Sequence, residues 1–174
     1  RALARFNHSI YEKNISLQQC RDFTHNGAID PKAFKIKELD LRMGNRCNLK
    51  CRSCYPGESS GWYKEWYETK GKKFRSGDQS VPLIMTSSGN IKTEGAEIDW
   101  VPQSKLLEYL SEDAPEFEQV HIVGGEPLLL SHHFDALEKF VQTGQSRNIT
   151  LDYNSNITVI PKRLLDLWSH FKKV

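Results

Sequence analysis

The sequence lacks long apolar runs and an excess of charge of either sign, and each absence excludes a class of protein. Its 174 residues carry 24 Lys and Arg against 22 Asp and Glu, which gives a net charge of +2. This balance excludes the strongly basic surface that is typical of nucleic-acid binding proteins. No apolar run reaches the roughly 20 residues that span a bilayer, and residues 1–7 do not form a signal peptide. We therefore expect a cytoplasmic protein without nucleic-acid or membrane partners.

Cysteine is also scarce, but three of the 4 cysteines are clustered. Cys47, Cys51 and Cys54 lie in the string CNLKCRSC, and Cys20 stands alone. Three thiols this close together cannot all pair with one distant cysteine, so we expect no disulfide framework. A structural zinc site uses four ligands, usually in two spaced pairs, and the chain has no second CxxC. Three thiolates fit an iron–sulfur cluster that leaves one iron open to a non-protein ligand. Zinc with a histidine ligand and free redox-active thiols stay as alternatives.

Turn signals and composition divide the chain into two parts. Residues 1–33 are poor in apolar residues and contain Asn26-Gly27 and Asp30-Pro31, which favour turns. We expect this segment to be an N-terminal arm on a core that covers residues 34–174. Within the core, residues 71–98 are polar and rich in Gly and Ser. We expect them to be an insertion that runs over the surface or is partly disordered.

The core alternates strand and helix patterns. Apolar and polar residues partly alternate before the cysteines, which predicts a strand, then the loop with the cysteines, then a helix. A strand followed by a helix, three times in succession, indicates an α/β fold built from parallel β/α units. The predicted strands cover 35–43, 119–123 and 148–153, and the predicted helices follow Glu58, cover 102–110 and 134–144, and begin at Pro161.

Other residues in the core have more than one interpretation. Four aromatic residues share one face of the helix after the cysteines, which favours packing on a sheet and leaves a substrate-stacking platform as the alternative. His132-His133 is expected to be exposed rather than metal-binding, and Cys20 is expected to be a bystander. Three cations around the cysteines either offset the charge of a cluster or face solvent. The aromatic residues are Trp62, Tyr63, Trp66 and Tyr67, and the cations are Arg46, Lys50 and Arg52.

Two motifs resemble those of the radical S-adenosylmethionine (radical SAM) enzymes. The three cysteines, followed by Tyr55, resemble the family's CxxxCxxC signature, and GGEP after the apolar run 120–123 resembles its glycine motif. The two glycines permit close approach to the backbone, and Glu126 offers an acceptor to an ammonium group. The loop Asn154-Ser155-Asn156 after the third strand resembles the family's Thr-Asn or Ser-Asn element. The resemblance assigns the cofactor to Tyr55, Gly124, Gly125, Glu126, Pro127, Asn154 and Asn156.

The resemblance implies a partial (β/α)6 TIM-like barrel with the cofactor at the carboxyl ends of its strands. This chain would supply about the first three β/α units, as a truncated first half of the core, together with the arm. The sequence around CNLKCRSCYP is similar to the branch that carries a C-terminal twitch or SPASM extension. Ser53 departs from the family pattern, which usually has an apolar or aromatic residue before the third cysteine.

The resemblance also implies the chemistry. Cys47, Cys51 and Cys54 would hold a 4Fe-4S cluster, and its fourth iron would bind S-adenosylmethionine for reductive cleavage to a 5′-deoxyadenosyl radical that abstracts hydrogen from a substrate. The expected partners are S-adenosylmethionine, an electron donor such as a flavodoxin or ferredoxin, and a substrate that is a peptide or a small molecule. A different class stays open, namely a non-catalytic module that binds zinc or a degenerate cluster.

Overall fold

The structure is a computed structural model that describes residues 17–22, 24–25, 28–29, 37–94, 98, 100–101, 104–111 and 117–174. The chain divides into two compact units, Arg1–Ile36 and Lys37–Val174. The first unit has helix α2 (Leu17–Asp22) and an antiparallel pair, β1 (Thr24–His25) and β2 (Ala28–Ile29). Cys20 lies in α2. The turn signals Asn26-Gly27 and Asp30-Pro31 lie outside the described residues.

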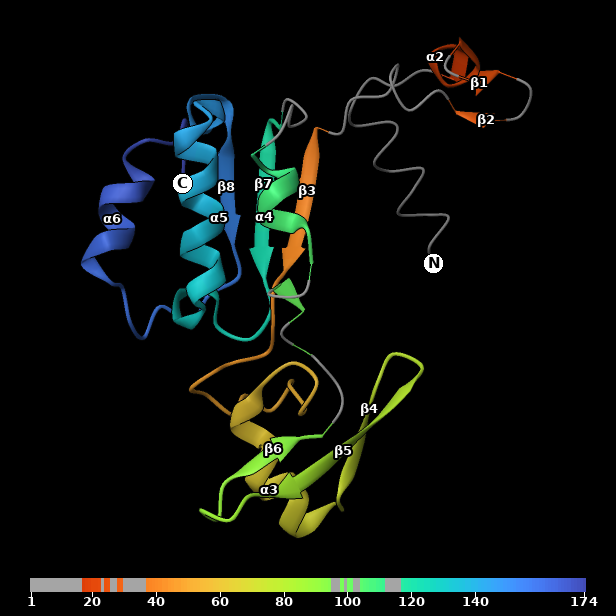
Figure 1. Cartoon of the computed structure of the whole chain (residues 1–174), viewed down its shortest axis with the longest axis vertical. Coiled ribbons are helices and arrows are strands. Elements are labelled where there is room, and N and C mark those ends of the chain that lie inside the picture. The colour runs from red at the N-terminus through yellow and green to blue at the C-terminus, as the bar shows by residue number, and fades with distance from the viewer. Residues whose placement is uncertain are drawn as a thin grey trace. The chain divides into compact units, whose positions relative to one another are not determined.

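The second unit is mixed α/β and contains a three-stranded parallel sheet in the order β3-β7-β8 (Figure 1). The strands are β3 (Glu38–Arg42), β7 (Gln119–Val123) and β8 (Thr150–Tyr153), and both strand pairs are parallel. All three strands fall within their predicted ranges. Parallel neighbours need a crossover, and α5 (Ser131–Gln142) supplies it between β7 and β8. The described part of this sheet is open.

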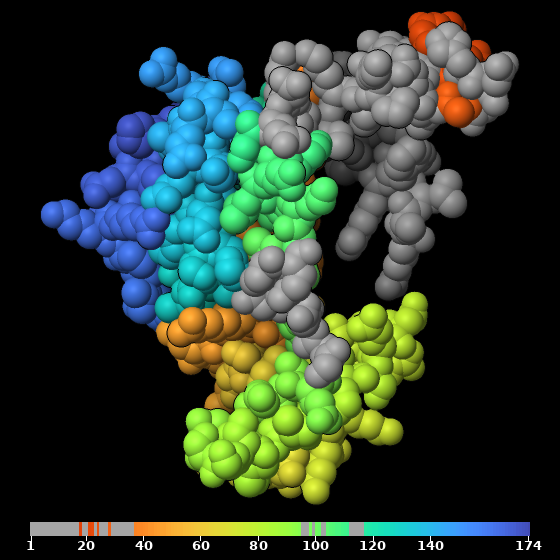
Figure 2. Space-filling view, in the orientation of Figure 1, coloured from red at the N-terminus to blue at the C-terminus, as the bar shows by residue number. Residues whose placement is uncertain are grey.

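Helices α4 (Leu106–Tyr109) and α5 lie in front of the sheet in Figure 1, and α6 (Lys162–Trp168) packs beside α5 (Figures 1 and 2). The core between them is aromatic and aliphatic, with Phe140 packed edge-on against Phe117 and Phe171. Gly144 ends α5 in the left-handed conformation, with φ of 77°, as predicted for a helix cap. Residues 102–103 of the predicted helix 102–110 lie outside the described residues. Within the described part of the chain, no helix is both long and apolar enough to span a bilayer.

A second, antiparallel sheet forms where the sequence predicted a polar insertion. It has the order β4-β5-β6, with β4 (Lys73–Ser76), β5 (Gln79–Met85) and β6 (Ile91–Thr93). The short helices η1 (Ser60–Trp62) and α3 (Tyr63–Thr69) precede it. Tyr63, Phe74, Val81 and Leu83 form its own buried cluster. Val81 and Leu83 alternate with exposed residues, and Gly77-Asp78 makes a two-residue hairpin loop, so the signals were present but weak.

The expectation that His132-His133 is exposed was wrong for His133. Its side chain is fully buried, whereas that of His132 is 20% exposed. His133 Nε2 lies 2.8 Å from Tyr153 Oη, which also accepts a hydrogen bond from Trp168 Nε1. His133 shares the buried stripe of α5 with Ala136, Leu137 and Phe140, at helical spacing.

Burial of His133 predicts a loss of stability in mild acid. Burial lowers the pKa of His133 from 6.5 to about 4, because the charged imidazolium loses its hydration. Below about pH 6.5 the unfolded chain binds more protons than the folded chain, so stability falls as the pH falls toward 4. As the pH is lowered from about 7.5 to about 5, the titration of His133 should lower the unfolding free energy by about 2 kcal/mol. Urea denaturation at the two pH values measures this change. His133→Gln, which does not titrate there, should lose less, and an equal loss in both chains would refute this assignment.

Candidate functional site

Three loops follow the three parallel strands and therefore start at the same edge of the sheet. We name them the cysteine loop (residues 43–59, after β3), the glycine loop (residues 124–126, after β7) and the asparagine loop (residues 154–158, after β8). Hydrogen bonds between the loops join all three. The residues that the sequence assigned to a cofactor lie on these loops, except Pro127, which directly follows the glycine loop.

The glycine loop packs directly on the backbone of the cysteine loop. Gly124 and Gly125 have φ of 97° and 53°, in the region that favours glycine. A Cβ atom on Gly124 would lie 2.7 Å from Gly44 O, and one on Gly125 would lie 2.6 Å from Asn45 C and also overlap Arg46 O. Glu126 N–H donates to Arg46 O at 2.8 Å. The two glycines therefore permit the approach of the cysteine loop just before Cys47.

The carboxylate of Glu126 joins the glycine loop to the asparagine loop. Glu126 is 1% exposed. Oε1 accepts from Leu128 N at 3.1 Å and from Ser155 Oγ at 2.8 Å, and Oε2 accepts from Asn156 N at 2.6 Å. These donors offset the cost of burying the charge. They leave about one of the four acceptor positions of the carboxylate for a further donor.

The asparagine loop reaches back to the first cysteine. Asn156 Nδ2 donates to Asn48 Oδ1 at 3.0 Å and to Cys47 Sγ at 3.8 Å. Asn48 Nδ2 in turn donates to Thr158 Oγ1 at 2.8 Å. Asn154 is exposed, and its backbone N–H donates to Ile122 O at 3.1 Å. The structure therefore brings Asn156, rather than Asn154, into contact with Cys47.

The three cysteines are free thiols on one loop. Cys51 is exposed, and Cys47 and Cys54 are half-buried. The pKa of the Cys54 thiol is raised, chiefly by burial, against the lowering effect of a hydrogen bond from Ser53, and further by the nearby Cys51 and Cys47. Three unpaired thiols fit an iron–sulfur cluster by the chemistry of the donor set. Within the described part of the chain, no group of three or more His, Cys, Asp or Glu side chains is arranged to hold one metal ion.

Polar contacts that the sequence did not single out hold the cysteine loop. Asn45 is buried, and its Nδ2 donates to Pro56 O and Tyr63 Oη, both at 2.7 Å. Ser59 Oγ donates to Leu49 O at 2.7 Å and caps η1. Ser60 Oγ accepts from Cys47 N at 3.2 Å. The serine pair before a helix is a cap signal that sequence inspection could have used.

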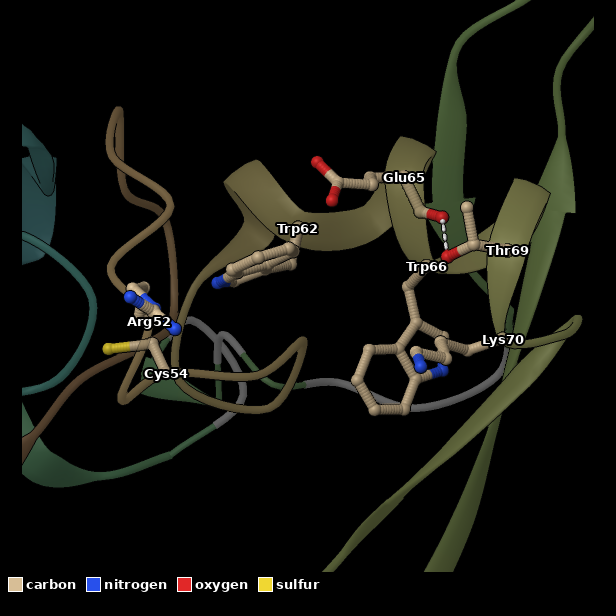
Figure 3. A pocket seen from close by; sticks show the side chains of 7 residues that line it. All are labelled: Arg52, Cys54, Trp62, Glu65, Trp66, Thr69 and Lys70. Atoms are coloured by element: carbon tan, nitrogen blue, oxygen red, sulfur yellow. Dashed lines mark hydrogen bonds between the residues drawn. The ribbon is translucent and has the colours of Figure 1, made fainter.

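A cavity of ≈ 210 Å³ lies beside Cys54, with Cys54 and Arg52 next to Trp62 at one end and Trp66 and Lys70 toward the other (Figure 3). Trp62 Nε1 donates to Cys51 O at 3.2 Å. The cavity is lined by Arg52, Cys54, Trp62, Glu65, Trp66, Thr69 and Lys70.

The predicted aromatic face is therefore divided between two environments. Trp62 lies against the cysteine loop, whereas Tyr63, Trp66 and Tyr67 pack with the second core cluster. Tyr55 joins that cluster too, edge-on to Phe74 with ring centroids 6.4 Å apart.

Pro127 and the three cations are the remaining residues that the sequence analysis singled out. Pro127 is buried and starts η3 (Pro127–Leu129). The three cations near the cysteines are exposed, and Lys50 pairs with Glu65 at 3.0 Å.

No protein-family model matches this chain, and neither the curated proteins nor the solved structures that were searched contain a match.

The close approach of the two loops predicts a large cost for Gly125→Ala. Gly77 is a matched control, because its φ of 57° is close to the 53° of Gly125 and a Cβ there meets nothing within 4 Å. Left-handed strain should cost both variants about 1–2 kcal/mol. The clash with the cysteine loop should cost Gly125→Ala about 1–3 kcal/mol more. Equal unfolding free energies for the two variants, measured by urea denaturation, would contradict the packing of these loops.

The buried carboxylate predicts that Glu126→Gln destabilises the chain. The amide nitrogen of Gln would face the backbone N–H of Asn156 or of Leu128, so the unfolding free energy should fall by about 1–3 kcal/mol. Glu68 is exposed on α3, and Glu68→Gln should stay within about 0.5 kcal/mol of the parent chain. Chemical denaturation of both variants measures the difference. An unfolding free energy of Glu126→Gln equal to that of the parent chain would show that the three hydrogen bonds contribute nothing to stability.

Proposed function

We propose that the chain belongs to a radical SAM enzyme, in which Cys47, Cys51 and Cys54 hold a 4Fe-4S cluster that binds S-adenosylmethionine. Its parallel sheet would then form the first three β/α units of a partial barrel. The substrate is a peptide or a small molecule, and an electron donor such as a flavodoxin or ferredoxin completes the system.

One observation carries this proposal. The GGEP and CxxxCxxC motifs lie about 70 residues apart in the sequence, and the structure packs Gly125 and Glu126 against Arg46, directly before Cys47. The parallel neighbours β3 and β7 bring the two loops to one edge of the sheet, and the two glycines let the loops touch there. Their meeting point is the residue before Cys47, at the carboxyl edge of a parallel sheet, where α/β proteins bind ligands.

The residues have definable roles in such a site. When bound, the cluster would supply the electron for reductive cleavage of S-adenosylmethionine, and with it the radical chemistry that acts on the substrate. The three thiols lose their protons to become ligands. Glu126, which is 1% exposed, would hold the asparagine loop in place through Ser155 and Asn156. Asn156 orients Cys47, and the glycines fix the distance between the cysteine loop and Glu126.

The proposal predicts that anaerobic reconstitution with iron and sulfide gives a brown chain with absorbance near ~400 nm. Cys51→Ala should lose most of the bound iron and sulfide, because it removes one of three ligands. Cys20→Ala is the matched control and should retain them. With dithionite and S-adenosylmethionine, the parent chain and Cys20→Ala should form 5′-deoxyadenosine, and Cys51→Ala should not.

Two results would count against this function. A colourless chain that binds one zinc ion would favour the metal-binding module. Formation of 5′-deoxyadenosine by Cys51→Ala at the parent rate would refute the ligand assignment.

A further inference from the structure

Asn156 is the residue of the asparagine loop that reaches a cysteine sulfur. It is 109 residues from Cys47 in the sequence, and its Nδ2 lies 3.8 Å from Cys47 Sγ. A backbone donor, Leu49 N, lies 3.4 Å from the same sulfur. Both residues of the Asn156–Cys47 pair are half-buried, which limits the access of water to this contact.

The orientation of the Asn156 amide is fixed by its neighbours. Oδ1 accepts from Thr158 N at 3.0 Å and from Thr158 Oγ1 at 2.7 Å. Nδ2 donates to Asn48 Oδ1, and Asn48 Nδ2 donates to Thr158 Oγ1, which closes a ring of three side chains. Exchanging the amide oxygen and nitrogen would set donor against donor at Thr158. The group that faces Cys47 is therefore the N–H donor.

The backbone of Asn156 is fixed as well. Its N–H donates to the buried Glu126 Oε2 at 2.6 Å. The next residue, Ile157, has φ of 52°, which is unusual for a β-branched side chain. Ile157 N–H donates to Ser155 Oγ at 3.0 Å, and Ser155 Oγ donates to Glu126. Strain that is held by surrounding contacts is common at functional sites.

We propose that Asn156 sets the reduction potential of the cluster through its hydrogen bond to Cys47 Sγ. This inference rests on the proposed function and gives Asn156 a positioning role through its contact with Cys47, which the motifs do not specify. Hydrogen bonds to the ligand sulfurs are one of the determinants of cluster potential. An N–H donor favours the state with more negative charge, which is the reduced cluster, and therefore raises the potential.

The test is a redox titration of the reconstituted full chain in the absence of S-adenosylmethionine. Electron paramagnetic resonance detects the reduced cluster at each potential. Asn156→Asp keeps the shape of the side chain and replaces the donor by an acceptor. Its equilibrium constant for one-electron reduction should fall about tenfold, which is about 59 mV for a one-electron couple. Asn156→Ala removes the donor without adding charge, and its potential should fall between those of the parent and Asn156→Asp.

Asn154→Ala is the matched control, because Asn154 is the same residue type in the same loop and is exposed. Its potential in the absence of S-adenosylmethionine should equal that of the parent. If Asn156→Asp does not load a cluster, Asn156→Ala decides the question alone. A parent-like potential in either Asn156 variant, or an equal fall in Asn154→Ala, would overturn this role while leaving the proposed function intact. Failure of the parent chain to form a cluster would overturn both.

Discussion

The buried carboxylate of Glu126 is the interaction on which the candidate site depends. A carboxylate that is 1% exposed is tolerated only with donors on both oxygens, and the chain supplies them from the asparagine loop and from Leu128 in η3. Glu126 also donates its backbone N–H to Arg46 O. Glu126 therefore fixes the asparagine loop through its side chain and the cysteine loop through its backbone. Without it, the three loops would share an edge of the sheet but not a common geometry.

The parallel sheet and the two glycines bring these loops within reach of Glu126. Parallel register puts the ends of β3, β7 and β8 at one edge, and the missing side chains of Gly124 and Gly125 allow backbone to touch backbone. The thiols then lie on a loop that is anchored at Arg46 on one side and at Ser59 and Ser60 on the other. This arrangement gives the cysteines a defined environment before any cluster is bound, which lowers the ordering cost of binding.

The parallel strands and the cap at Gly144 could be predicted from the sequence, because their signals are local patterns of apolar residues and glycine. The antiparallel sheet was not foreseen, because only Val81, Leu83 and a Gly-Asp turn mark it within a polar segment. His133 was expected to be exposed because it follows His132 at the start of a helix. Its helical spacing with Ala136, Leu137 and Phe140, which places it on the buried face, was not considered. Asn45 and Ser155 were missed for a different reason. Their side-chain hydrogen bonds reach partners 11 to 29 residues away in the sequence, and nothing in the local sequence marks such contacts.

The decisive measurement is Mössbauer spectroscopy of the chain reconstituted with ⁵⁷Fe, before and after addition of S-adenosylmethionine. Three thiolates leave one iron of the cluster without a protein ligand. That iron alone should change its signal when the amino and carboxylate groups of S-adenosylmethionine bind, while the other three keep theirs. A spectrum that S-adenosylmethionine does not alter, or that lacks the signature of a cubane cluster, would contradict the proposed function.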